Sequence, residues 1–211
     1  MQDLLPILGI FAVFSPALML PGPDFVVVVR NTMAHGRRNG VLTALGISIG
    51  IVLYAGLSVV GIATLLNQLA WFGSVIRILG ATFLTYLGIN LLFTRHAPRA
   101  LESSSNTPSP RPNARNPVFL GLLVNLTNPK AIVFFASIFS TAIRPSMSPL
   151  LLTELVIALG ICGFLWFSLI SMATATTGFL VSLEDHQHWI ERFAGVAFLG
   201  FAAKLLVDLL R

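Results

Sequence analysis

Pro21-Gly22-Pro23-Asp24 interrupts an apolar run that begins near Leu4 and ends near Val29. Two prolines and a glycine break a helix, because proline lacks the backbone N–H and clashes with the preceding turn. In a soluble protein this tetrapeptide would indicate a turn. Within so apolar a run it predicts a broken transmembrane helix with an ionisable group beside the break. A second break, Asn128-Pro129-Lys130, interrupts a later apolar run.

The composition is that of a membrane protein. The chain is 55% hydrophobic and 10% charged, with a mean hydropathy of +0.86, whereas soluble domains carry roughly 25% charged residues. Several runs exceed the ~18 apolar residues that mark a spanning helix. The ~10-residue alternating segments of a β-barrel are absent from the sequence. We therefore expect an all-α integral membrane protein with a single domain, residues 1–211.

Six transmembrane helices are predicted. They cover about residues 4–34 with a break at 21–23, 41–66, 69–93, 117–143 with a break at 128–129, 149–181, and 189–210. Residues 95–115 are polar and rich in proline, serine and arginine, which predicts a linker between two halves of the chain.

The arginines lie mainly in two connections, so the net charge of +5 indicates membrane orientation and not a nucleic-acid partner. The first connection, between the first and second helices, holds Arg30, Arg37 and Arg38, and the linker holds four more arginines. By the positive-inside rule both connections are cytoplasmic, which places both termini outside.

The two halves of the chain resemble each other, which predicts two three-helix repeats, about 1–94 and 116–211. Aligning Pro23 with Pro129 places Asp24 on Lys130 and Gly22 on Asn128. An odd number of helices per repeat inverts the second repeat in the membrane, and many secondary transporters are built in this way. A second match relates the third and sixth helices: Arg77, Gly80, Phe83, Leu84 and Tyr86 recur as Arg192, Gly195, Phe198, Leu199 and Phe201.

Asp24 and Lys130 thus occupy equivalent positions with opposite charges. A charge inside a helix bundle costs at least ~2.5 kcal/mol, and it usually has a partner or a function. We expect both side chains to face a central cavity, paired with each other when it is empty and with a zwitterion when it is filled. The N–H groups freed at the two breaks attract a carboxylate. The alternative is a salt bridge that only orients the broken helices.

Arg77, about two turns into the third predicted helix, has two interpretations. Its guanidinium could hold a substrate carboxylate through a bidentate contact. It could equally extend to the outer membrane interface and contact no substrate.

The two breaks lie within motifs that resemble a known family. The segment from Ser15 to Phe25, SPALMLPGPDF, is similar to the first-helix signature of the LysE/RhtB family of amino-acid exporters. The segment from Gly121 to Ala131, GLLVNLTNPKA, is similar to that family's fourth-helix signature. The length, the polar linker and the closing segment Arg192-Phe193-Ala194-Gly195 also agree, so the resemblance covers essentially the whole chain.

The resemblance implies export of amino acids across the bacterial inner membrane by proton antiport. An acid directly after P-G-P makes the chain most like the threonine and homoserine exporter branch. The expected partners are a small neutral amino acid, protons and the lipid bilayer, without a cofactor or a resident metal. The residues that the family motifs carry over are Pro21, Gly22, Pro23, Asp24, Asn125, Asn128, Pro129 and Lys130.

Other functions remain open at this point. Metal-cation efflux proteins and thiol-redox carriers belong to the same superfamily, but the four histidines form no complete ligand set and Cys162 is the one cysteine. No nucleophile–base pair or phosphate loop suggests an enzyme. Gly46 and Gly50 have the G-x-x-x-G spacing of close helix packing, which permits a homodimer without requiring one.

Overall fold

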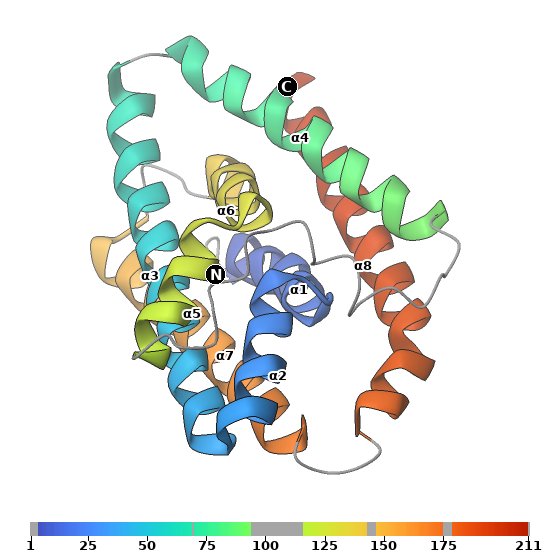
Figure 1. The fold of residues 1–211 in the computed structure, drawn as a ribbon. Coiled ribbons are helices and arrows are strands. Elements are labelled where there is room, and N and C mark those ends of the chain that lie inside the picture. Colours follow the sequence, from blue (N-terminus) through green and yellow to red (C-terminus); the bar gives the residue numbers. More distant parts are fainter. Residues whose placement is uncertain (1–3, 69, 94–115, 143–146, 175–178, 211) are drawn as a thin grey trace.

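The structure is a computed structural model that describes residues 4–68, 70–93, 116–142, 147–174 and 179–210, and every secondary-structure element in these ranges is helical (Figure 1). The prediction of an all-α fold is therefore confirmed. The eight helices are α1 Leu4–Met19, α2 Pro23–His35, α3 Arg37–Gln68, α4 Ala70–Phe93, α5 Pro117–Leu126, α6 Pro129–Ala142, α7 Pro149–Thr174 and α8 Phe179–Leu210.

Both predicted helix breaks are confirmed. The axes of α1 and α2 differ by 48°, and those of α5 and α6 by 65°, so each pair is sharply bent, as in a broken span or a re-entrant loop. In the described residues, the Arg37–Gly61 part of α3 and the whole of α7 are long and apolar enough to cross a membrane. With the two bent pairs this gives up to four spans, and α4 adds a shorter apolar stretch, Ile78–Phe93.

Each break is followed by a helix that begins at a proline. Pro23 starts α2 after Gly22, which has an extended backbone at the N-cap, and Pro129 starts α6. Proline suits the first helical position because its φ angle is already helical and it has no N–H that needs an acceptor. Both prolines therefore end one helix and begin the next, and the chain changes direction without leaving its span.

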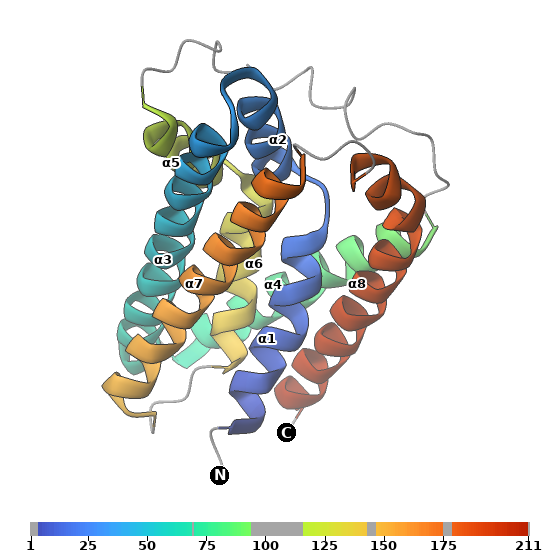
Figure 2. The same ribbon diagram turned by 90° about the horizontal axis from the view of Figure 1, so that it is seen from below.

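The helices pack as a bundle in which α1 and α6 are central, α4 packs along α8, and α3 packs against both α5 and α7 (Figures 1 and 2). Glycines allow α3 and α5 to approach closely. A side chain at Gly46 would overlap the backbone of Val118, and one at Gly121 would overlap the backbone of Thr43. The face of α3 with Gly46 and Gly50, which the sequence left open as a possible homodimer contact, is thus covered by α5 of the same chain.

One predicted boundary was wrong. Residues 182–188 were expected to connect the fifth and sixth helices, and the fifth was expected to reach Val181. Instead α7 ends at Thr174, residues 175–178 lie outside the described part, and α8 already begins at Phe179. Residues 179–194 contain no glycine or proline, so nothing in the backbone stops the helix and the charged residues of this segment continue it.

The two breaks lie at similar depth. The start of α1 and the end of α8 are at one end of the bundle, and the turn between α2 and α3 is at the other (Figure 2). That turn passes through Gly36, which has a φ of 83°. Between the end of the bundle that holds this turn and the two breaks, α2 has 13 residues and α5 has 10. At about 1.5 Å per residue, these half-helices are about 20 and 15 Å long, so both breaks lie inside the bundle and not at its end.

Candidate functional site

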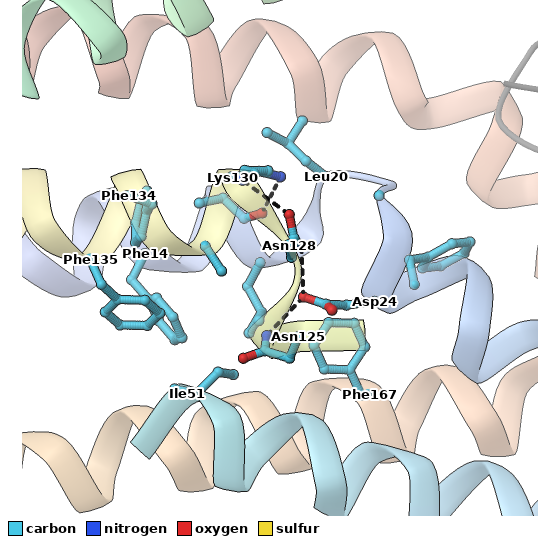
Figure 3. Close-up of a pocket in the computed structure, with 15 residues that line it drawn as sticks. Phe14, Leu20, Asp24, Ile51, Asn125, Asn128, Lys130, Phe134, Phe135 and Phe167 are labelled. Atoms are coloured by element: carbon cyan, nitrogen blue, oxygen red, sulfur yellow. Dashed lines mark hydrogen bonds between the residues drawn. The ribbon is translucent and has the colours of Figure 1, made fainter. Parts of the chain in front are cut away.

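A cavity of about 50 Å³ lies where the two breaks meet (Figure 3). Its walls come from six helices, α1, α2, α3, α5, α6 and α7. Four of the predicted site residues line it, Asp24, Asn125, Asn128 and Lys130, as does Gly22 of the first break. Pro21 and Pro23 frame that break, and Pro129 lies at the second. Arg77 belongs to α4, but its side chain lies outside the described part of the structure.

The two carboxylate oxygens of Asp24 differ in their hydrogen bonds to the described residues. Its Oδ2 accepts hydrogen bonds from Asn125 Nδ2 at 3.0 Å and from Asn128 Nδ2 at 3.2 Å. Its Oδ1 is buried and has no hydrogen-bond partner in the part of the chain that the structure describes. Asp24 is the second residue of α2, where the positive end of the helix dipole stabilises a negative charge. The carboxylate is therefore held in place on one side and can accept a further donor on the other.

Asn128 connects the two broken spans. Its side-chain oxygen accepts the backbone N–H of Lys130 at 3.1 Å, while its side-chain nitrogen donates to Asp24. The first contact is an N-terminal cap, which satisfies one of the N–H groups that have no partner within a helix. One asparagine therefore caps α6 and orients the acid of α2.

Lys130 binds the other broken span. Its Nζ donates to the backbone oxygen of Ala17 at 3.1 Å, near the C-terminus of α1. Cations are favourable at this end of a helix, because the last carbonyls lack partners and carry the negative end of the dipole. Asp24 and Lys130 thus line one cavity, but in place of the expected contact with each other they bind different partners, and Asn128 lies between them (Figure 3).

Tyr54 also supports the site, although no sequence motif identified it. Its hydroxyl donates to the backbone oxygen of Leu126, the last residue of α5, at 2.5 Å. Its ring stacks on Phe135, with the centroids 6.2 Å apart and the planes 18° apart. A lone tyrosine in an apolar helix carries little signal, since its role depends on a carbonyl that is exposed only by the break.

Gly50 supports Asn125 in a similar way. Asn125 is 1% exposed, and a side chain at Gly50 would overlap its amide oxygen. The space left by the missing Cβ therefore admits the amide that orients Asp24. The sequence indicated close packing at Gly50 but not that its neighbour is a site residue.

A helical membrane bundle whose two broken spans meet at a cavity lined by one acid, one lysine and two asparagines has the architecture of a transport protein. Comparison with known families agrees. A model of the LysE type translocators matches residues 16–209, and the chain belongs to this family. It is a multi-pass membrane transporter and not an enzyme.

Related proteins cover nearly the full chain. The threonine efflux proteins of Salmonella typhi and of Escherichia coli strain K12 are each 29% identical over 193 residues, which is 91% of this chain and 93% of theirs. An uncharacterized membrane protein of Haemophilus influenzae is 32% identical over 204 residues, 95% of this chain and 96% of its own. No solved structure gives a significant match.

Proposed function

We propose that this protein is a secondary active exporter that carries a small neutral amino acid out of the bacterial cytoplasm by proton antiport. The observation that carries the proposal is the carboxylate of Asp24, whose Oδ1 has no hydrogen-bond partner among the described residues. Asp24 lines the same cavity as Lys130. The threonine efflux proteins among the relatives support an amino acid as the substrate, of the threonine or homoserine kind or another neutral one.

The balance of charges at the cavity favours a zwitterion. Asp24 and Lys130 are its one acid and one base among the described residues that line it. A substrate with one ammonium and one carboxylate can match both, whereas an additional charge on its side chain would be buried without a partner at a high cost. The site therefore favours a neutral amino acid.

In the proposed cycle, a proton and the ammonium of the substrate compete for the carboxylate of Asp24. Asp24 loses its proton toward the cytoplasm, and its Oδ1 then accepts the ammonium of the substrate. Lys130, with N–H groups at the breaks, holds the carboxylate. When the cavity opens to the outside, a proton replaces the ammonium on Asp24 and the substrate leaves. Each turnover thus exchanges one bound species for the other at the same carboxylate.

Six spans arranged as two inverted repeats, about 1–94 and 116–211, fit this mechanism. Asp24 and Lys130 are each the second residue of a half-helix that begins at a proline. The packing of α3 on α7 and of α4 on α8 pairs each helix with its proposed counterpart. α2 and α6 have similar lengths, 13 and 14 residues, whereas α1 is six residues longer than α5, 16 against 10, so the extra residues belong to the first half-helix.

The proposed orientation in the bacterial inner membrane places both termini outside. Arg37 and Arg38 begin α3 at the end of the bundle that lies opposite the start of α1 and the end of α8 (Figure 2). Basic residues favour the cytoplasmic side, so this end faces inward. A cysteine added at the C-terminus should react with a membrane-impermeant reagent in intact cells, and protection there would reverse the orientation.

Purified protein in liposomes tests the proposal. Labelled neutral amino acids, including threonine and homoserine, should accumulate against their gradient only when a pH gradient is imposed. Failure of all of them to move or exchange would refute the proposal. Cys162→Ser should retain full transport, since a thiol carrier of the same superfamily would lose its function with this cysteine.

A further inference from the structure

The cavity has a polar end and an apolar end. The four polar side chains gather at the helix breaks, with Phe167 beside Asp24, whereas Phe14, Phe134 and Phe135 lie together on the other side of them (Figure 3). The centroids of these rings are 5.6 to 6.2 Å apart. Ile51 of α3, which is 2% exposed, adds an aliphatic wall. An amino acid whose ammonium and carboxylate bind at the breaks therefore directs its side chain toward apolar groups.

No hydroxyl group belongs to the described residues that line the cavity. Two hydroxyls on α3 are committed elsewhere, since Tyr54 donates to the Leu126 carbonyl and Ser48 donates to the Gly160 carbonyl at 2.7 Å. A substrate hydroxyl at the apolar end would therefore give up its hydrogen bonds to water without a replacement, which is unfavourable.

The polar end offers little to a substrate hydroxyl either. The side-chain nitrogens of Asn125 and Asn128 already donate to Asp24, and Asn128 Oδ1 accepts the N–H of Lys130. The Oδ1 of Asn125 is buried and has no hydrogen-bond partner among the described residues, but it packs against Gly50 of α3, where a Cβ would overlap it. Asp24 Oδ1 is the acceptor that the ammonium requires, so the polar groups other than Asn125 Oδ1 are used by one another or by the part that all amino acids share.

We propose that the transported amino acid has an apolar, aliphatic side chain, so that valine is a better substrate than threonine. This inference rests on the proposed function and narrows its substrate class. Valine and threonine have nearly the same shape, and they differ by a methyl group in place of a hydroxyl. Their comparison therefore isolates the effect of the hydroxyl from that of size.

The experiment measures the initial rate of exchange of labelled valine and labelled threonine by the wild-type protein in liposomes, over a range of concentrations. An apolar pocket discriminates against an added hydroxyl by up to about 100-fold, and we expect kcat/KM to favour valine by about 10- to 100-fold. Equal values, or a preference for threonine, would overturn the inference and leave the proposed exporter intact. Transport of neither, nor of any other amino acid, would overturn both.

A pair of variants tests whether the apolar wall causes this preference. Ile51→Thr places a hydroxyl beside the cavity, and it should reduce the preference for valine several-fold. Ile47→Thr makes the same change one turn away in α3, at a fully buried residue that does not line the cavity. This control should keep the wild-type ratio even if it lowers expression, and an equal reduction in both variants would refute the role of the wall.

Discussion

Replacement of Asp24 by asparagine should weaken substrate binding without unfolding the protein. The oxygen of the new amide can still accept hydrogen bonds from Asn125 and Asn128, as Asp24 Oδ2 does now at 3.0 and 3.2 Å. The amide nitrogen would then take the place of Oδ1. It would present donors, and not an acceptor, to the ammonium of the substrate.

The size of the effect follows from the contact that is lost. A hydrogen bond to a charged group contributes about 1.5 to 3 kcal/mol, and each 1.4 kcal/mol changes an affinity about tenfold. Asp24→Asn should therefore weaken substrate binding by roughly 10- to 150-fold. It should also remove the response to a pH gradient, because an amide cannot carry the proton.

Two assays in liposomes separate these effects. Exchange of labelled for unlabelled amino acid reports binding and movement without a pH gradient, and net uptake reports coupling. Glu154→Gln is the matched control, since Glu154 is exposed near the start of α7 and its loss should change neither assay. Asp24→Asn with wild-type KM and a wild-type response to the pH gradient would refute the role assigned to this carboxylate.

Three further variants test the groups around Asp24. Gly50→Ala should displace the amide of Asn125 and lower transport roughly tenfold or more, but it should add little in an Asn125→Ala background. Additive effects of these two changes would contradict the positioning role of Gly50. Gly56→Ala, at a position with open space around it, is the control and should be neutral. Lys130→Gln should raise KM roughly tenfold or more, because it removes a charged partner of the substrate carboxylate, and an unchanged KM would contradict that contact. Tyr54→Phe should lower the free energy of unfolding in a detergent titration by roughly 1 kcal/mol, and wild-type stability would contradict its role at the end of α5.

The broken helices could be predicted from the sequence because the signals are local. Proline disrupts a helix through its own ring and its missing N–H, so Pro23 and Pro129 mark the breaks without knowledge of any neighbour. The pairing of Asp24 with Lys130 as residues of one cavity followed from the alignment of the two breaks. The structure places both of them at that cavity.

The details of the site could not be predicted, because they depend on contacts between distant segments. Lys130 binds the Ala17 carbonyl, 113 residues away in sequence, and Tyr54 binds the Leu126 carbonyl, 72 residues away. Each contact requires a carbonyl left open by a break and a donor that the packing brings near it. No sequence pattern marks either carbonyl as an acceptor. The sequence therefore suggested that Lys130 pairs with Asp24 and gave no sign of its contact with a backbone carbonyl.

The start of α8 illustrates a different limit. The acidic and histidine residues between 184 and 188 are typical of a connection between apolar helices, and polarity suggested one there. A helix stops when its backbone is interrupted or when its end is capped, and polarity alone does neither. The structure continues the helix through these residues from Phe179.

The central claim is that an amino acid binds at Asp24 in the cavity between the two breaks. A carbodiimide modifies a protonated carboxyl group in apolar surroundings, and the extent of modification at Asp24 can be measured by mass spectrometry of the purified protein. We predict that a transported neutral amino acid slows this modification in a concentration-dependent manner, whereas lysine does not. Modification of Asp24 at an unchanged rate in the presence of a transported substrate would contradict the claim.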